Sequence, residues 1–271
     1  MALANRLVGN TPDACATEIT YGNAEMRFET DTAVALAGAE VEADLSGRPA
    51  PMHRTLNAKR GEVLKLARPS QGVRTYVAVA GGIAGEPTFG SQSTFLPAGF
   101  GGHEGRALRA GDVLELPAAR KGEILETPVP LRPHMSASHV LRCVPGPDGD
   151  MLTGAAWNEP SETSARLDRT GIELTGPWPQ LQDAAQRPSE ALFPGAVQLT
   201  PSGRAFLLLP DSQTTGGYPH VLQVIRADRH LLGQIGAGNR VRVLRRTPEE
   251  AAADLRAKSA LFADWLPGFR F

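Results

Sequence analysis

The sequence predicts a mainly β protein with two related lobes and a few short helices, and three observations support this. Gly (29 residues) and Pro (22) are frequent, while only 21% of the 271 residues are charged, a composition typical of turn-rich β proteins. Short apolar or alternating runs recur between turn signals along both halves, which indicates a barrel or a sandwich. A weak internal repeat also relates the two halves.

The first half begins with a helix and continues as strands. "MALANRLVGN" places Leu3 and Leu7 at helical spacing, and Gly9-Asn10 is a suitable stop signal. We predict strands at residues 25–29, 32–38, 41–47, 62–67, 74–82 and 112–117. These elements form the first lobe, residues 1–120.

The second half starts after a change in composition. Residues 118–137, "AARKGEILETPVPLRPHMSA", contain three prolines, so we predict a linker at residues 121–137. A second β-rich lobe follows at residues 138–246, with the strand runs "HVLRCVPG", "GIELTG", "GAVQLTPSG", "RAFLLLPD", "HVLQVIRA" and "NRVRVLRR". Thr247-Pro-Glu-Glu supplies an N-cap, a Pro at the first helical position and two acids, which predicts a C-terminal helix and tail at 247–271.

Charge, cysteines and hydropathy exclude several classes of protein. The formal net charge is -1, which does not suggest a nucleic-acid or anionic-membrane surface. Cys15 and Cys143 match no metal or disulfide spacing and are expected to be reduced thiols. No apolar run approaches the roughly 20 residues that span a bilayer, and the N-terminus lacks a signal-peptide core. We therefore expect a cytoplasmic protein.

The internal repeat centres on two polar loops. Strand "TYVAVAGG" leads to Ser91-Gln92-Ser93-Thr94, and strand "AFLLLP" leads to "DSQTTGGYP", in which Ser212-Gln213-Thr214-Thr215 is the matching stretch. Each copy precedes an Ala-Gly turn into a final strand. Hydroxyl and amide side chains beside glycines suit a ligand cradle. The alternative is a tight loop whose polar side chains bond to its own backbone.

Several long blocks carry a resemblance to a known family. They are "RTYVAVAGGI", "GSQSTFLPAGFGGHEGRALRAGD", "VPGP", "LDRTGIELTGP", "FPGAVQLTPSGRAFLLLPDSQTTGGYP" and "VIRADRHLLGQIGAGNRVRV". In this order they resemble the KipA family, also called allophanate hydrolase subunit 2 or the biotin-dependent carboxyltransferase family, which includes the C subunit of bacterial 5-oxoprolinase. The resemblance implies two cyclophilin-like β-barrel lobes. Members of that family usually carry a further N-terminal block before the helix at which this sequence starts, which implies a shortened first lobe.

The resemblance also implies a chemistry. The 5-oxoprolinase couples ATP cleavage to opening of a stable lactam, which requires a polar cradle and donors for a phosphoryl group. ATP, with Mg, is the implied co-substrate. No resident metal site is expected in this chain, and no attached biotin, because a Met-Lys attachment pattern is missing. We expect Asp211 and Gln213 to be catalytic; the expected substrate-binding residues are Ser91, Gln92, Ser93, Thr94, Glu104, Arg106, Arg169, Thr214, Thr215, Gly216, Gly217 and Tyr218.

Some of these residues have structural alternatives. "GFGGHEGR" matches no Walker pattern, and Glu104 with Arg106 also suits a surface ion pair in a turn. His103 in the same stretch is a lone histidine, which is seldom a general base. Asp168 and Arg169 suit a turn cap or an ion pair as well as a site. The apolar tail "FADWLPGFRF" suits either packing on a lobe or docking on a partner.

The partners follow from the resemblance. The implied partners are a KipI-like B subunit and a LamB/YcsF-like A subunit, so the expected function is that of one component of an ATP-dependent 5-oxoprolinase, inactive alone. A carboxyltransferase module of a urea or amide carboxylase is one alternative. A KipA-type regulator that antagonises a KipI-like kinase inhibitor is the other. Nucleic acid and membrane are not expected partners.

Overall fold

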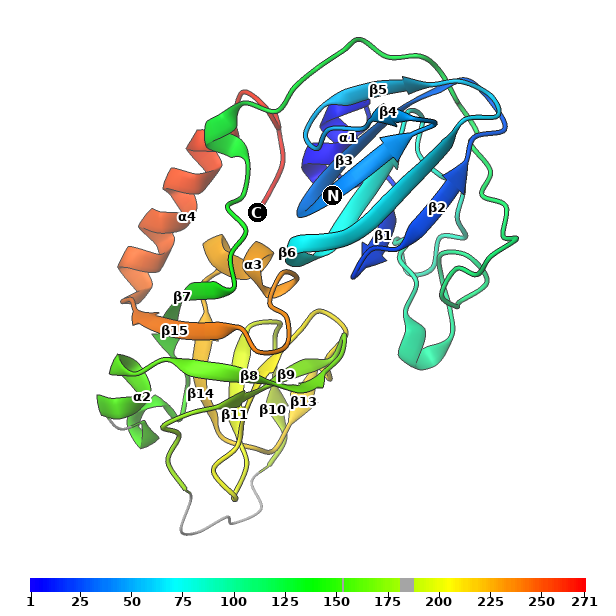
Figure 1. Ribbon diagram of the computed structural model, residues 1–271. Helices are drawn as coiled ribbons and strands as arrows, with labels where there is room; N and C mark the ends of the chain where they lie inside the picture. Colours follow the sequence, from blue (N-terminus) through cyan, green and yellow to red (C-terminus); the bar gives the residue numbers. More distant parts are fainter. Residues whose placement is uncertain (153, 181–187) are drawn as a thin grey trace. The chain divides into compact units, whose positions relative to one another are not determined.

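The structure is a computed structural model that describes residues 1–152, 154–180 and 188–271 (Figure 1). The chain divides into two compact units. Unit 1 comprises Met1–Met135 and Phe262–Phe269, and unit 2 comprises Ser136–Leu261 and Arg270–Phe271. Each unit has a buried apolar core of its own.

Unit 1 is built on an antiparallel sheet, with one helix beside it. Its elements are α1 (Ala2–Leu7), β1 (Thr17–Thr20), β2 (Ala24–Arg27), β3 (Thr32–Leu45), β4 (Arg48–Pro49), β5 (Thr55–Ala58), β6 (Val63–Val79) and the short 3-10 helices η1 (Leu96–Ala98) and η2 (Val129–Leu131). The strand order is β1-β6-β3-β4, with β2 also on β6 and β5 also on β3. The 14-residue β3 and the 17-residue β6 form the centre of this sheet.

These two central strands are longer than the sequence predicted. The separately predicted runs 32–38 and 41–47 lie mostly in one strand, β3, which ends at Leu45, and most of the runs 62–67 and 74–82 belongs to β6, which ends at Val79. The pairing of β3 with β6 shifts register three times between Gly38 and Ala43. Bulges bend a strand without ending it, so the turn-like residues at this point did not mark a boundary.

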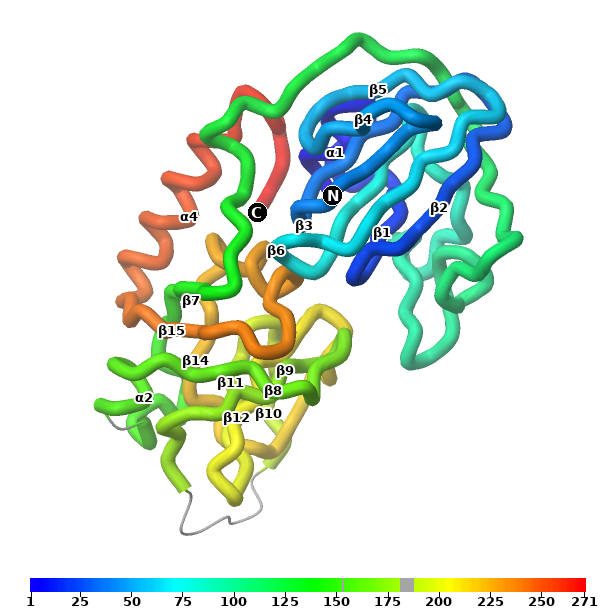
Figure 2. The backbone as a smooth tube through the Cα atoms, in the orientation of Figure 1, coloured from blue at the N-terminus to red at the C-terminus, as the bar shows by residue number. Residues whose placement is uncertain are grey.

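Residues 80–118 follow an irregular path (teal in Figure 2). The predicted strand at 112–117 is wrong, because no ladder forms there among the described residues. Leu114 and Leu116 instead pack against the sheet core, and Ala84 N–H donates to Glu115 O at 2.9 Å. The alternating pattern therefore reflects packing on one side and not strand pairing.

Residues 121–135, within the expected linker, lie against β5 in unit 1. Asn57 exchanges two hydrogen bonds with Gly122, at 3.0 and 3.1 Å, and Thr55 N–H donates to Leu125 O at 2.9 Å. Thr127 N–H donates to His53 O at 2.9 Å. This segment therefore continues the first unit up to Met135.

Unit 2 contains a closed barrel. Its elements are β7 (Ser138–Pro145), η3 (Gly149–Met151), α2 (Gly154–Asn158), β8 (Ser161–Leu167), β9 (Gly171–Thr175), β10 (Glu190–Ala191), β11 (Ala196–Leu199), β12 (Ala205–Leu208), β13 (Thr215–Gly216), β14 (His220–Val224), η4 (Arg226–Asp228), α3 (Arg229–Leu232), β15 (Arg240–Arg245) and α4 (Pro248–Phe262). The barrel order is β11-β12-β9-β8-β15-β7-β14, and β14 closes it by pairing with β11. The predicted class, mainly β with a few short helices and a C-terminal helix, is confirmed.

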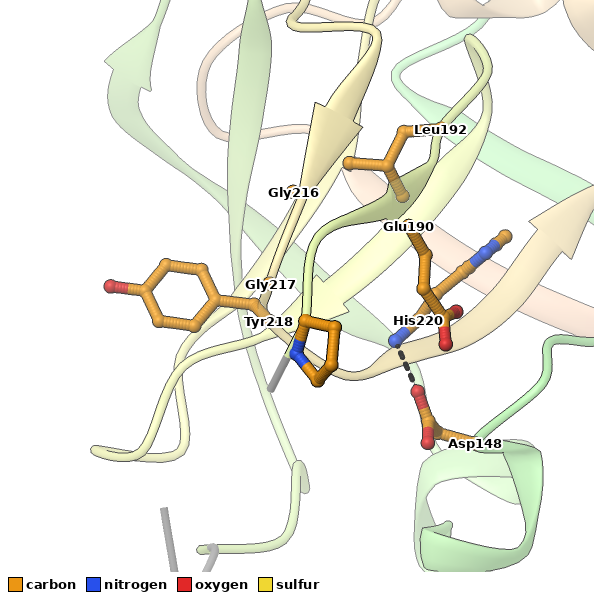
Figure 3. A pocket seen from close by; sticks show the side chains of 8 residues that line it. Asp148, Glu190, Leu192, Gly216, Gly217, Tyr218 and His220 are labelled. Atoms are coloured by element: carbon orange, nitrogen blue, oxygen red, sulfur yellow. Dashed lines mark hydrogen bonds between the residues drawn. The ribbon is translucent and has the colours of Figure 1, made fainter. Parts of the chain in front are cut away.

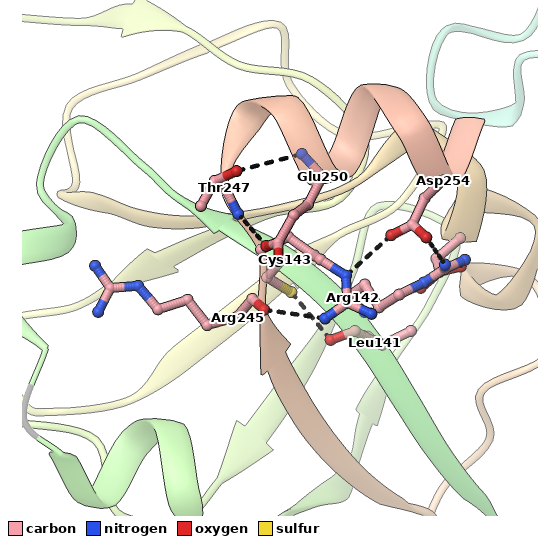
Figure 4. Close-up of polar contacts among 9 residues, drawn as sticks. Leu141, Arg142, Cys143, Arg245, Thr247, Glu250 and Asp254 are labelled. Atoms are coloured by element: carbon pink, nitrogen blue, oxygen red, sulfur yellow. Dashed lines mark hydrogen bonds and ion pairs between the residues drawn. The ribbon is translucent and has the colours of Figure 1, made fainter. Parts of the chain in front are cut away.

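The C-terminal helix begins as the sequence predicted. Glu250 N–H donates to Thr247 Oγ1 at 3.2 Å, and Thr247 N–H donates to Glu250 Oε2 at 2.8 Å, which is a capping box (Figure 4). One turn later, Asp254 pairs with Arg142 of β7 at 2.8 Å and with Arg246 at 3.0 Å. These ion pairs fix the first turns of α4 to the barrel.

Residues 262–269 of the aromatic tail pack within unit 1, whereas Arg270 and Phe271 belong to unit 2. Trp265 lies against the small-residue cluster of α1, and Leu266 is buried. The Arg6 guanidinium donates to Trp265 O at 2.9 Å and lies 5.1 Å from the Trp265 ring centroid. Of the two alternatives for the tail, these residues therefore show packing. No helix among the described residues combines the length and apolarity that a membrane span requires.

Candidate functional site

The loop at 209–219 in unit 2 is held by an ion pair at its start. Asp211 Oδ2 lies 2.6 Å from Arg169 Nε, and Asp211 N–H donates to Arg169 O at 3.2 Å. Arg169 lies in the turn between β8 and β9, and β9 pairs with β12 so that Gly171 is opposite Leu208. The sheet register therefore brings these two predicted site residues together, 42 positions apart in sequence.

The turn that carries Arg169 is itself tightly bonded. Asp168 Oδ1 accepts from Thr170 N–H at 2.7 Å, from Thr170 Oγ1 at 2.6 Å and from Gly171 N–H at 3.1 Å. Burial of Asp168 raises its pKa, but these hydrogen bonds outweigh that effect and hold the pKa below its usual value. Of the interpretations that the sequence left open for Asp168, the structure shows a turn cap.

A buried glutamine holds the middle of the same loop. Gln198 of β11 is 3% exposed, and its Nε2 donates to Tyr218 O at 3.0 Å. Its Oε1 accepts from Gln213 Nε2 at 3.2 Å. A Cβ on Gly216 would lie 3.0 Å from Gln198 Nε2, so glycine permits this close approach. Sequence reasoning missed Gln198, although a single amide within the apolar run "AVQL" was a signal.

The outer side of this loop remains accessible. The side chains of Gln213, Thr214 and Thr215 are exposed, and Tyr218 is 54% exposed. Only two residues of the loop form a strand, β13, which pairs with β10 and places Thr215 opposite Ala191. The loop thus presents amide, hydroxyl and backbone groups from a fixed base.

A small pocket lies beside the glycines of the loop (Figure 3). Asp148, Pro188, Glu190, Leu192, Gly216, Gly217, Tyr218 and His220 line it. His220 N–H donates to Asp148 Oδ2 at 2.8 Å, and in Figure 3 the Tyr218 ring points away from the other labelled side chains. Burial lowers the pKa of His220, which favours the neutral form of its ring. His220 Nε2 is buried without a partner among the described residues.

The first-unit loop bonds largely to itself. Thr88 and Ser91 exchange backbone hydrogen bonds at 2.8 and 3.0 Å, and Ser93 N–H donates to Ser91 Oγ at 3.1 Å. Gln92 Nε2 donates to Gly85 O at 3.0 Å. Thr94 packs so closely on a glycine of the next turn that a Cβ there would lie 2.0 Å from Thr94 Oγ1. Ser91, Gln92 and Ser93 are exposed.

The Arg106 guanidinium is bound by two carboxylates. It donates to Asp112 at 2.7 and 2.9 Å and to Glu104 at 2.7 and 3.0 Å. Hydrogen bonding to Arg106 holds the pKa of Asp112 far below its usual value. His103 Nε2 lies 3.8 Å from Asp112 Oδ1. Arg106 is thus part of an ion-pair cluster, the alternative that the sequence offered, and Asp112 is a member that sequence reasoning missed.

The predicted site residues therefore form two groups. Unit 2 brings together Arg169, Asp211, Gln213, Thr214, Thr215, Gly216, Gly217 and Tyr218. Unit 1 holds Ser91, Gln92, Ser93, Thr94, Glu104 and Arg106. Within the described ranges, no three His, Cys, Asp or Glu side chains are grouped to hold a metal ion.

The two predicted cationic ligands are not free to bind a nucleotide. A triphosphate requires free cationic donors or a nest of backbone N–H groups. Arg106 and Arg169, the predicted cationic ligands, are each bound to carboxylates. The residues that line the pocket include two carboxylates, Asp148 and Glu190, and no Lys or Arg. We therefore assign no residue of this chain to ATP or to Mg.

Comparison with known proteins shows similarity to 5-oxoprolinase C subunits and to a putative urea carboxylase. The chain is 37% identical over 255 residues to the 5-oxoprolinase C subunit of Escherichia coli (strain K12), covering 93% of this chain and 81% of the relative. The corresponding C subunit of Haemophilus influenzae is 32% identical over 266 residues, covering 96% of this chain and 84% of the relative. A putative urea carboxylase of Emericella nidulans is 32% identical over 89% of this chain but only 21% of its own length.

Solved structures show the same fold inside longer chains. The crystal structure of TTHA0988 superposes with a TM-score of 0.79 at 35% identity and covers 90% of this chain, which spans 48% of that longer one. The Kluyveromyces lactis urea amidolyase superposes with a TM-score of 0.90 at 25% identity, covering all of this chain and 18% of its own. The family model of the carboxyltransferase domain, subdomain A and B, matches residues 1–245. This chain therefore belongs to the carboxyltransferase domain family.

Proposed function

We propose that this chain is the C subunit of an ATP-dependent 5-oxoprolinase, which hydrolyses 5-oxo-L-proline to L-glutamate with ATP cleavage. Two curated relatives of that name match 93% and 96% of this chain, and each is itself covered over more than four fifths of its length. The assembly includes a KipI-like B subunit and a LamB/YcsF-like A subunit, and it works in the cytoplasm. These partners are proposed to supply most of the binding site for ATP and Mg.

The observation that supports the proposal is the loop at 209–219 of unit 2, whose base is fixed by hydrogen bonds and an ion pair while its outer side is exposed. Gln213, Thr214 and Thr215 offer an amide and two hydroxyls, and Gly216 and Gly217 allow a ligand to approach the backbone. 5-Oxoproline presents one lactam amide and one carboxylate, which these groups can bind. Preorganised neutral donors stabilise a developing charge on the amide oxygen without reorganising at the moment of reaction.

The two expected catalytic residues receive different roles. Gln213 is exposed and is proposed to contact the lactam directly. Asp211 is bound by Arg169 at 2.6 Å, and its side chain is only 11% exposed. It is therefore proposed as a positioning residue that fixes Arg169 and the start of the loop.

ATP and Mg are proposed to be bound mainly by the partner subunits. The support is the engagement of Arg106 and Arg169 by carboxylates in this chain. ATP cleavage makes the amide carbon electrophilic when the complex is assembled. This chain contributes the lactam cradle, and biotin has no part in the proposal.

The test is reconstitution. The chain is co-expressed with its KipI-like and LamB/YcsF-like partners, and 5-oxoproline-dependent phosphate release is measured. We expect activity only in the complex, and we expect Gln213→Ala to lower kcat/KM about 10–100-fold through loss of transition-state contacts. Gln71→Ala, a second exposed glutamine, is the matched control and should remain active. Full activity of an Asp211→Ala, Gln213→Ala double variant would refute the site.

A second candidate is a carboxyltransferase module of a urea or amide carboxylase. It is favoured by the superposition of all of this chain on 18% of the Kluyveromyces lactis urea amidolyase. This alternative predicts transfer of a carboxyl group from a biotinylated carrier to urea, with no 5-oxoproline-dependent phosphate release. A regulator of a KipI-like kinase inhibitor, the third alternative, predicts binding of the KipI-like partner with neither activity.

A further inference from the structure

Lys258 of α4 is held by two neutral acceptors. Its Nζ lies 2.6 Å from Ala227 O, in η4, and 2.7 Å from His230 Nδ1, in α3. Among the described residues, no carboxylate forms a salt bridge with Lys258, and the Phe271 ring centroid lies 4.8 Å from Nζ. To accept this hydrogen bond, His230 Nδ1 must be unprotonated. The amine is therefore oriented by groups that do not require it to be charged.

The other three lysines of the chain have different surroundings. Lys59, Lys65 and Lys121 are exposed, whereas Lys258 is half-buried. Lys65 pairs with Glu25 at 3.1 Å, and Lys121 pairs with Asp31 at 3.2 Å, and such pairing favours the ammonium form. These residues serve as internal controls for the chemistry of Lys258.

Burial favours the neutral amine at Lys258. It lowers the pKa of Lys258 to about 8, while the nearby Asp228 raises it and Arg142 lowers it further. An appreciable fraction of the amine is then unprotonated at neutral to mildly alkaline pH, and only this form is nucleophilic. His230 is exposed at the surface, so a reagent can approach from its side.

The surrounding charges select the kind of electrophile. Arg226 precedes Ala227 and is exposed, Arg229 precedes His230, and Asp228 between them is paired with Arg142. Arg229 Nε is buried and has no hydrogen-bond partner among the described residues. An anionic donor is attracted to such a segment, whereas a cationic one is repelled.

We propose that Lys258 is a modification site that is acylated by acyl phosphates, with His230 as the positioning residue. The Nζ lone pair attacks the acyl carbon, an N–C bond forms, and the C–O bond to phosphate breaks. Phosphate leaves with the electron pair, and the proton from Nζ passes to the departing phosphate or to solvent. The products are an amide and inorganic phosphate, with no change of oxidation state.

Acylation would weaken the contact of α4 with the barrel. An amide nitrogen retains one N–H, so it cannot donate to both Ala227 O and His230 Nδ1. The cation–π contact with Phe271 is also lost with the charge. We expect faster amide exchange in the last turns of α4 after modification, and unchanged exchange in β2 of unit 1.

The test uses the complete chain and acetyl phosphate at pH 8, with site-resolved mass spectrometry. A pKa near 8 predicts that Lys258 is acetylated roughly tenfold faster than Lys65, because the larger neutral fraction outweighs the lower intrinsic nucleophilicity. His230→Ala should reduce the Lys258 rate to within about twofold of Lys65, because the amine loses the hydrogen-bond acceptor that orients it. His134→Ala, which also removes an exposed histidine, is the matched control and should leave both rates unchanged.

Three results would overturn the proposal. Acetylation of Lys258 no faster than that of Lys65 would show that the amine is ordinary. An unchanged Lys258 rate in His230→Ala, in a variant with wild-type thermal unfolding, would remove the role of His230. An equal rate with acetyl-CoA at matched concentration would show that phosphate is not the preferred leaving group.

Discussion

Replacing Gln198 with Met tests whether the candidate loop is held from inside the barrel. Met has a similar size and shape but cannot donate to Tyr218 O or accept from Gln213 Nε2. We expect the barrel to remain folded, since the change conserves volume at a buried position. The loop, in contrast, loses both hydrogen bonds to Gln198 and keeps the ion pair of Asp211 with Arg169.

The magnitude follows from these two hydrogen bonds. A typical intramolecular hydrogen bond contributes about 0.5–1.5 kcal/mol, so their loss should lower the free energy of unfolding by about 1–3 kcal/mol. The effect is larger if Tyr218 O stays buried without a donor. Because the loop carries the proposed lactam contact Gln213, KM should rise in the reconstituted complex.

The assay is amide hydrogen exchange of residues 211–218 with urea unfolding of the same samples. Gln223→Met is the matched control, because Gln223 also makes two side-chain hydrogen bonds, to Pro194 O at 3.1 Å and to Val224 O at 3.2 Å, in the same barrel. We expect faster exchange of the loop only in Gln198→Met. Equal exchange of the loop in the two variants would refute the reasoning.

Three further predictions concern stability. Asp228→Asn should lower the free energy of unfolding of unit 2 by about 3 kcal/mol in urea titrations, because it breaks a pair in which Arg142 donates three hydrogen bonds to a carboxylate that is 5% exposed. Gly105→Ala should cost at least about 2 kcal/mol locally and speed proteolysis of residues 96–112, since φ is +64° and the Cβ would lie 2.0 Å from Gly99 O. Burial, with help from Arg132, lowers the pKa of His53 from 6.5 to about 4, so the unfolded chain binds the proton first and stability should fall as pH drops from about 6.5 to about 4. His53→Asn, which suits φ 61°, should flatten that pH profile in thermal unfolding.

Local signals in the sequence predicted the elements that depend on near neighbours. The capping residues Thr247 and Glu250 identified the start of α4, and alternation between turn signals identified most barrel strands. Both signals operate within a few residues, so they can be recognised without knowledge of the fold. We predicted a break between two strands at residues 38–41, but the structure has a bulge within β3. The prediction failed because bulges and turns use similar residues.

The candidate site was only partly predictable, because its contacts are long-range. The family blocks identified Asp211 and Arg169, but their pairing depends on the register of β9 with β12. Gln198 lies 15 positions from Gln213, and no local pattern connects them. Arg106 suggested an anion-binding site. In the structure its guanidinium instead donates to the carboxylate of Asp112, six residues away.

The parallel pairing of β15 with β7 has a consequence for how unit 2 forms. Arg240 lies opposite Ser138, so the chain must join segments about 100 residues apart before the barrel can close. Such non-local pairing is slow because the entropy of a long loop is lost before the contacts form. During synthesis, the edges of β7 and β8 that pair with β15 remain unpaired until Arg240–Arg245 has left the ribosome. Chains interrupted before that strand should therefore be prone to aggregation through those edges.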